Sequence, residues 1–208
     1  LKVIASGTTG VNHIDVEYAK KKGIEVISLQ GANTVATAEH ALALMLGLMR
    51  NVPAAHSSLL SGKWHRAAFI GTELCGKKLG IVGFGRIGRD IAKVAMHFGM
   101  RILAYDPYLP ENVFAEHNAA QSTSLDAIFS ESDVITLHVL LTEETRNLVN
   151  KQRLALMKPT SVLINCSRGE IVSELDLVDA LKNKKIAGAA LDVFVNEPSQ
   201  CKWDKRDI

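Results

Sequence analysis

The stretch from Lys77 to Arg89, K-K-L-G-I-V-G-F-G-R-I-G-R, limits the possible folds of this chain more than any other. It predicts an apolar strand, a turn with three glycines, and a helix from Arg89 to Phe98. Gly83 permits the turn, Gly85 lets the backbone approach an anion, and Gly88 lets the helix pack closely on the strand. Because the first amides of a helix lack partners within it, this turn predicts a site for the phosphates of a dinucleotide.

A carboxylate follows at the end of the next predicted strand. That strand runs from Arg101 to Tyr105 and ends at Asp106, 18 residues beyond Gly88. In dinucleotide-binding folds a carboxylate at this place accepts hydrogen bonds from the ribose hydroxyls. It would repel a 2′-phosphate, and residues 107–110 contain no Lys or Arg. The sequence therefore predicts NAD as the cofactor rather than NADP.

Apolar and amphipathic segments alternate along the rest of the chain. Further strands are predicted at Val134 to His138, Ser161 to Asn165 and Ala187 to Val193, with helical segments between them. Such alternation predicts a parallel sheet with right-handed crossovers and helices on both faces. The predicted fold class is α/β, a doubly wound parallel sheet of the Rossmann type.

The segment before the glycine turn contains two helices and a threonine-rich turn. Thr34 to Arg50 is apolar on most sides, so this helix must be buried against its own domain, a second domain or a second subunit. A shorter helix follows from Pro53 to Leu60. Near the N-terminus, Thr8 and Thr9 lie between two glycines and could hold a small anion, although an ordinary capped turn explains the same residues.

Composition excludes several classes of protein. A net charge of +2 over 208 residues gives no reason to expect nucleic acid or an acidic membrane surface as a partner. The three cysteines, odd in number and far apart, fit neither a disulfide framework nor a metal site and suggest a reducing cytoplasm. Neither the metal-binding spacing H-E-x-x-H nor the hydrolase motif G-x-S-x-G occurs. We expect no metal.

Polar residues follow the last two predicted strands, where a parallel sheet binds its ligands. Arg168 could bind a carboxylate through two hydrogen bonds and polarise the adjacent carbonyl, or it could pair with a neighbouring acid. Asp192 could accept from a nicotinamide carboxamide, and Glu197 could orient a histidine base. Capping of a turn is the alternative for both acids.

Four spaced motifs resemble the D-isomer-specific 2-hydroxyacid dehydrogenases: G-F-G-R-I-G, Y-D-P, N-C-S-R-G-E-I-V and L-D-V-F-V-N-E-P. The resemblance runs from Leu1 to Pro198, and Leu60 to Gly83 resembles the branch that oxidises 3-phosphoglycerate, in serine biosynthesis. It implies hydride transfer between NAD and a small D-2-hydroxy acid, with 3-phosphoglycerate as the leading candidate. A glyoxylate, hydroxypyruvate or D-lactate type of reductase stays open, as does a corepressor-like NAD sensor without enzymatic activity.

The resemblance also assigns roles to residues. Arg168 would bind and polarise the substrate with Thr8 nearby, and Glu197 would be the acidic partner of the catalytic histidine. The residues expected to bind the cofactor are Thr9, Gly83, Gly85, Arg86, Ile87, Gly88, Asp106, Val139, Cys166, Ser167, Arg168 and Asp192.

The same resemblance implies a domain division and a partner. Residues 1–31 would be the C-terminal part of a flavodoxin-like substrate domain, and residues 32–208 a Rossmann domain that is incomplete at its C-terminus. The long helix from Thr34 would form much of a homodimer interface.

Three departures from the family pattern matter. The catalytic histidine is expected beyond Ile208, so we expect this chain to bind NAD but to oxidise 3-phosphoglycerate negligibly. Ser6 stands where the phosphoglycerate enzymes often carry an Arg for the substrate, and Leu140 replaces a common proline.

Overall fold

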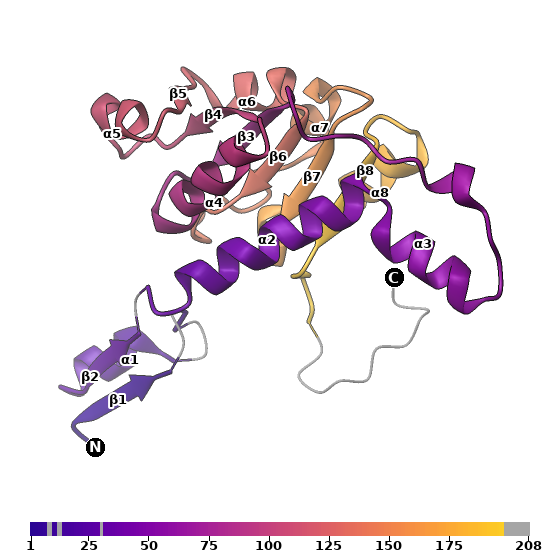
Figure 1. Ribbon diagram of the computed structural model, residues 1–208. Helices are drawn as coiled ribbons and strands as arrows, with labels where there is room; N and C mark the ends of the chain where they lie inside the picture. The colour runs from indigo at the N-terminus through magenta and orange to yellow at the C-terminus, as the bar shows by residue number, and fades with distance from the viewer. Residues whose placement is uncertain (8–9, 12–13, 30, 198–208) are drawn as a thin grey trace.

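The computed structural model describes residues 1–7, 10–11, 14–29 and 31–197, which form two separate parallel sheets (Figure 1). The smaller sheet pairs β1 (Val3–Ser6) with β2 (Glu25–Ser28), and α1 (Val16–Lys21) lies between them in sequence. Figure 1 places this unit beyond the start of the long helix α2, away from the larger sheet. The proposed division of the chain near residue 31 stays a prediction.

The larger sheet has six strands in the order β5-β4-β3-β6-β7-β8, and every neighbouring pair is parallel. This order confirms the doubly wound α/β fold, and the strand order reverses between β3 and β6, where such sheets bind their ligands. The strands are β3 (Lys78–Val82), β4 (Arg101–Tyr105), β5 (Ala120–Gln121), β6 (Val134–Leu137), β7 (Val162–Asn165) and β8 (Gly188–Leu191).

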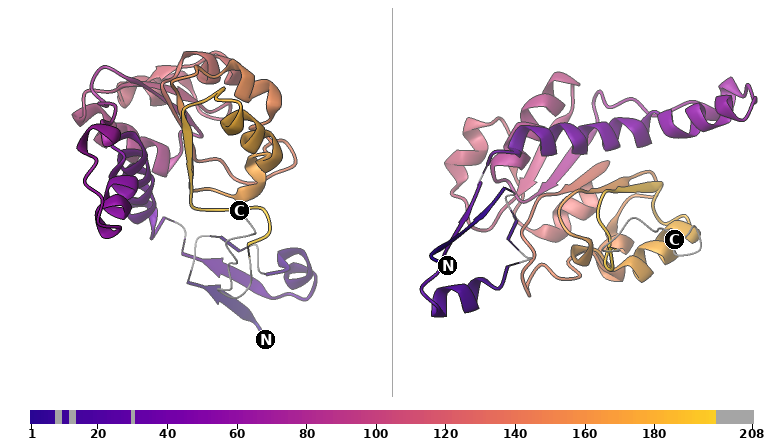
Figure 2. Two further views of the ribbon diagram at one scale, coloured as in Figure 1. Left: turned by 90° about the vertical axis from the view of Figure 1, so that its right-hand side faces the viewer. Right: turned by 90° about the horizontal axis from the view of Figure 1, so that it is seen from below.

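Helices cover both faces of this sheet, as the left view of Figure 2 shows. The first face carries α2 (Thr34–Met49), α4 (Arg86–His97) and α5 (Glu111–Glu116), whose buried side chains belong to one apolar cluster. The second face carries α6 (Leu125–Glu131), α7 (Lys151–Leu156) and α8 (Glu174–Lys182), which bury their side chains in another cluster.

The alternation of side chains along β3 explains how one strand serves both clusters. Leu79 and Ile81 point into the first cluster and Val82 into the second, and all three are at most 1% exposed. Gly80 also faces the second cluster, where a side chain would meet α6. The central strands are apolar on both sides because both faces of the sheet are covered.

Two features of the first face differ from the sequence prediction. Helix α4 begins at Arg86 rather than Arg89, so Gly88 lies inside the helix and is buried with Ile91, Ala92 and Ala95 along one face. The short elements α5 and β5 were not predicted, because a six-residue helix and a two-residue strand are too short to carry a periodic pattern.

Helix α3 (Val52–Leu60) has no buried residue and extends away from the sheet (Figures 1 and 2). The segment after it contains the short 3₁₀ helix η1 (Arg66–Phe69). This arm, residues 52–70, exposes large apolar side chains, among them Leu60 at 76% and Trp64 at 75%. No helix in the described ranges is long and apolar enough to cross a membrane.

A buried hydroxyl beneath β3 has no hydrogen-bond partner within the described part of the chain. Ser132 is 0% exposed, and its Oγ lies 2.2 Å from the position that a Cβ on Gly80 would occupy. A small residue at position 80 therefore leaves room for the serine but offers its hydroxyl no acceptor. Burying an unpaired hydroxyl costs roughly 1–3 kcal/mol by mutational measurements.

Removing this hydroxyl is expected to stabilise the protein. Ser132→Ala should raise the free energy of unfolding by about 1 kcal/mol in a urea titration, because the unsatisfied group is lost. Ser130→Ala is the matched control, since Ser130 is exposed in the last turn of α6, the helix that Ser132 ends, and should change stability by less than about 0.5 kcal/mol. A loss of stability in Ser132→Ala would mean that the hydroxyl is satisfied in solution.

Candidate functional site

The turn between β3 and α4 is built by backbone atoms that approach too closely for side chains. Gly83 has φ +91°, and a Cβ there would lie 2.6 Å from the carbonyl oxygen of His138. A Cβ on Gly88 would lie 2.4 Å from the carbonyl oxygen of Gly83. Both distances are shorter than the contacts that Cβ atoms make in proteins, so glycine is required at both positions for this turn to form.

Open space lies above the same turn. Gly85 is the N-cap of α4, no side chain caps the helix there, and a Cβ on Gly85 would meet no atom within 4 Å. The first amides of α4 are thus left without a side-chain acceptor and carry the positive end of the helix dipole. This arrangement fits the pyrophosphate of a dinucleotide, which would supply the missing acceptors.

Asp106 is held against this turn by backbone donors. Its Oδ2 accepts from the Phe84 N–H at 3.0 Å and its Oδ1 from the Tyr108 N–H at 3.1 Å. Each carboxylate oxygen has further capacity to accept, so the ribose hydroxyls of a bound dinucleotide could still bind there. The position fits the role predicted from its spacing to Gly88.

A cavity of about 630 Å³ opens beyond the ends of β6 and β7. Strand-end loops form one wall, and residues from the start of α2 and from the smaller unit form the other. Its lining residues are Gly10, Val11, Asn33, Thr37, Ile87, His138, Val139, Leu140, Leu141, Thr142, Cys166, Ser167 and Arg168.

Arg168 brings a positive charge to this cavity. Its Nη1 donates to the Ser167 carbonyl at 2.6 Å, and its own carbonyl accepts from the Asn165 side chain at 2.9 Å. Within residues 31–197, no carboxylate lies within ion-pair distance of its guanidinium. An arginine placed this way can bind the carboxylate of a ligand.

The Arg168 turn is packed directly onto the loop that carries Glu197. A Cβ on Gly169 would lie 2.0 Å from the carbonyl carbon of Phe194, so the two backbones touch. Glu197 Oε1 accepts from the Phe194 N–H at 3.0 Å, which is the turn-capping role expected as the alternative. Glu174 Oε1 accepts from the neighbouring Val195 N–H at 2.7 Å.

Two ionisable groups of the cavity wall are neutral near pH 7. Burial, and secondly the charge of Asp192, raises the pKa of the Cys166 thiol to about 12, so it is not a nucleophile. Burial lowers the pKa of His138 to about 3, and its Nε2 forms a hydrogen bond of 2.7 Å with the Thr136 hydroxyl. A base with so low a pKa is poorly matched to proton abstraction near neutral pH.

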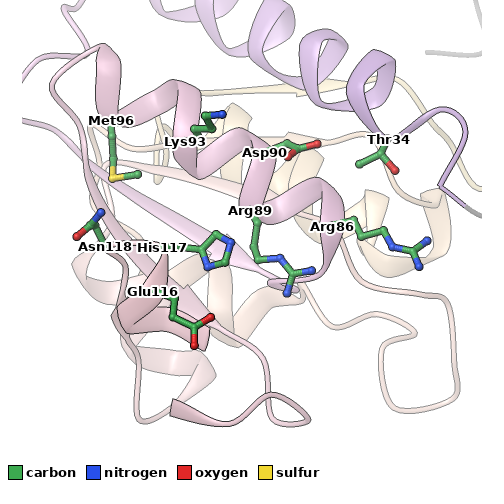
Figure 3. Close-up of a pocket in the computed structure, with 9 residues that line it drawn as sticks. All are labelled: Thr34, Arg86, Arg89, Asp90, Lys93, Met96, Glu116, His117 and Asn118. Atoms are coloured by element: carbon green, nitrogen blue, oxygen red, sulfur yellow. The ribbon is translucent and has the colours of Figure 1, made fainter. Parts of the chain in front are cut away.

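A second cavity of about 570 Å³ lies along the outer side of α4 (Figure 3). Arg86 lines this cavity rather than the first one, and its Nη1 lies 2.8 Å from the position of a Cβ on Gly31. Arg89 and Lys93 follow it along α4, with acidic Asp90 and Glu116 nearby. The lining of this cavity therefore mixes positive and negative side chains.

The structure brings several predicted residues together at the first cavity and leaves others outside it. Ile87, Val139, Cys166, Ser167 and Arg168 line it. The adjoining turn contains Gly83, Gly85 and Gly88, and Asp106 accepts a hydrogen bond from that turn. Asp192 lies just after β8, where His40 contacts it. Thr8 and Thr9 lie outside the described residues.

The described ranges contain no group of His, Cys, Asp and Glu able to hold a metal ion.

Sequence reasoning missed the contribution of α2 to the site. Asn33, Thr37 and His40 all come from the start of this helix, which reads as a purely structural apolar segment. The available signal was the pair Glu39-His40, the two ionisable residues of an otherwise neutral helix.

Known proteins resemble this chain in both sequence and fold. Residues 42–206 match the family described as D-isomer specific 2-hydroxyacid dehydrogenase, NAD binding domain. A D-3-phosphoglycerate dehydrogenase of Synechocystis sp. is 49% identical over 95% of this chain and 36% of its own length. A hydroxypyruvate reductase of Thermotoga maritima is 44% identical over 95% of this chain and 63% of its own length.

A solved structure of D-lactate dehydrogenase from Aquifex aeolicus, in complex with NAD and lactic acid, superimposes with a TM-score of 0.85 at 36% identity. The match covers 94% of this chain and 59% of that one. The chain thus spans about a third of the Synechocystis relative and less than two thirds of the other two.

Asp106 is expected to set the preference between the two dinucleotides. Asp106→Ala should weaken NAD binding by roughly tenfold, because a charged hydrogen-bond acceptor of the ribose is lost, and should narrow the gap between NAD and NADP. Calorimetric titration of both cofactors measures the effect. NADP binding as tight as NAD binding in the unsubstituted chain would contradict the assignment.

Proposed function

This chain belongs to the D-isomer-specific 2-hydroxyacid dehydrogenases through its NAD-binding domain, and we propose that the protein oxidises or reduces a small D-2-hydroxy acid or 2-oxo acid with NAD. NAD is the cofactor, and its nicotinamide supplies the hydride acceptor or donor. The residues of this chain would bind and orient the two reactants.

The observation that carries the proposal is the position of Arg168. This residue lines the cavity beside the glycine turn, and its guanidinium is paired with no carboxylate in the part of the chain that the structure describes. There it would bind the substrate carboxylate through two hydrogen bonds and polarise the adjacent carbonyl of the 2-oxo acid. Oxidation also requires a base for the hydroxyl proton, and the low pKa of His138 argues against that residue.

Glu197 would support a histidine base at the edge of this cavity. Its carboxylate is held by the Phe194 N–H, and Gly169 fixes that loop against the Arg168 turn. The base and the substrate-binding arginine would therefore be placed by two turns in direct backbone contact. Residues 1–31, as the end of a substrate domain, would close the cavity from the other side, where Gly10 and Val11 already line it.

We favour 3-phosphoglycerate as the substrate. The support is the 49% identity to a D-3-phosphoglycerate dehydrogenase, whereas the hydroxypyruvate reductase and D-lactate dehydrogenase relatives favour smaller acids. Ser6 is buried and carries no charge. The phosphate of this substrate would therefore need a positive charge other than that of Arg168, which binds the carboxylate. Free thiols at Cys75 and Cys166 support a cytoplasmic location.

The proposed partner is a second copy of this chain. Helix α2 buries one side against its own domain, through Ala38, Ala41, Leu42, Met45 and Met49. The exposed apolar residues of the arm have no cover within the described chain, and two-fold pairing is the commonest way to cover such a surface.

Arg168 provides the test of the proposed function. Binding of 2-oxo acids to the NADH complex can be followed by fluorescence, with 3-phosphohydroxypyruvate, hydroxypyruvate, glyoxylate and pyruvate as the panel. Arg168→Met should weaken binding of the preferred acid by roughly 10- to 100-fold, because a charged hydrogen bond is worth about 1.5–3 kcal/mol. Arg168→Lys should recover part of it. Unchanged binding in Arg168→Met would exclude the arginine as the carboxylate site.

Oligomeric state tests the proposed partner. Sedimentation at micromolar concentration should show a dimer, and Leu60→Lys with Trp64→Lys should shift it towards a monomer, because two charges would enter an apolar interface. Leu175→Lys is the control, since Leu175 is 86% exposed on α8, away from the arm. A monomer before substitution would mean that the arm has another role.

A further inference from the structure

A contact between two polar side chains connects α2 to the end of β8, beside the candidate cofactor site. His40 Nε2 lies 3.1 Å from Asp192 Oδ1, and each side chain is 50% exposed. A half-exposed pair contributes little to stability on its own. Its importance depends on what the Asp192 carboxylate does and on whether the helix holds His40 in place.

Two contacts fix α2 along β8. At one end, a Cβ on Gly188 would lie 3.3 Å from Leu48 Cδ1, and at the other end His40 meets Asp192. The eight steps from His40 to Leu48 rise about 12 Å in a helix. The four steps from Gly188 to Asp192 rise about 13 Å in a strand. The similar lengths keep both contacts in register, with the helix antiparallel to the strand.

Asp192 lies next to the Arg168 cavity although it does not line it. Its backbone N–H donates to the Asn165 carbonyl at 3.0 Å, at the end of β7. Its charge contributes to the raised pKa of the Cys166 thiol, and Cys166 lines the cavity. His40 engages one carboxylate oxygen, and the other oxygen can accept from a ligand.

We propose that His40 is a positioning residue for the nicotinamide end of NAD. It donates from Nε2 to Asp192 Oδ1 and so sets the rotation of the carboxylate, whose other oxygen then accepts from the carboxamide N–H of the nicotinamide. The inference rests on the proposed role of Asp192 in the cofactor site. It adds a role for α2, which would hold part of the catalytic rim as well as cover the sheet.

Binding of two related ligands tests this proposal without turnover. NADH carries the nicotinamide, and ADP-ribose carries the same adenosine and pyrophosphate without it. Both can be titrated calorimetrically against the unsubstituted chain, His40→Leu and His40→Gln. Glutamine retains an N–H donor near the position of the histidine Nε2, and leucine has none. His97→Leu, on an exposed residue in the last turn of α4, is the control.

His40→Leu should weaken NADH binding by roughly two- to fivefold, the range that a solvent-exposed side-chain pair contributes, and leave ADP-ribose binding unchanged. His40→Gln should restore most of the loss, and His97→Leu should have no effect. In a chain that already carries Asp192→Ala, His40→Leu should cause no further loss, because the histidine acts through that carboxylate.

Other outcomes would contradict either the positioning role of His40 or the nicotinamide site itself. Equal weakening of NADH and ADP-ribose by His40→Leu would overturn the positioning role and indicate a structural one, as would a failure of His40→Gln to restore binding. Additive losses from His40→Leu and Asp192→Ala would overturn it as well. If the unsubstituted chain bound ADP-ribose but not NADH, the proposed nicotinamide site itself would fail, and the role of His40 with it.

Discussion

The approach of backbone to backbone around Gly83 is the constraint on which the site depends. The carbonyl of Gly83 lies where a side chain on Gly88 would stand, and the His138 carbonyl lies where a side chain on Gly83 would stand. These contacts bring the end of β3, the start of α4 and the end of β6 within touching distance. The uncapped start of α4, the position of the Asp106 carboxylate and the wall of the Arg168 cavity all follow from this arrangement.

The sequence was sufficient to predict the position of a residue where the geometry of the fold allows that residue type alone. The glycines of the turn and Asp106 could be predicted because their spacing follows from strand, turn and helix geometry. The fold class followed equally well, because strands buried on both faces must be largely apolar, as β3 and β6 are. The domain boundary and the roles of Thr8 and Thr9 stay predictions.

Sequence was insufficient where the position of a residue depends on tertiary packing. His40 meets Asp192 only because α2 lies antiparallel to β8, which no local pattern records. The side chain of Arg86, at the start of α4, lies beside Gly31, which its spacing in the glycine motif does not indicate, and its role in cofactor binding stays a prediction. Local spacing fixes where a backbone goes, but the direction of a long side chain on a helix surface depends on its neighbours.

The neutral His138 has a consequence for the electrical character of the cavity. Among the lining residues that the structure describes, burial keeps His138 and Cys166 neutral near pH 7, because it lowers the pKa of the first to about 3 and raises that of the second to about 12. The guanidinium of Arg168 is then the charge that the lining itself carries. An anionic ligand would therefore meet a single positive charge in an otherwise neutral wall.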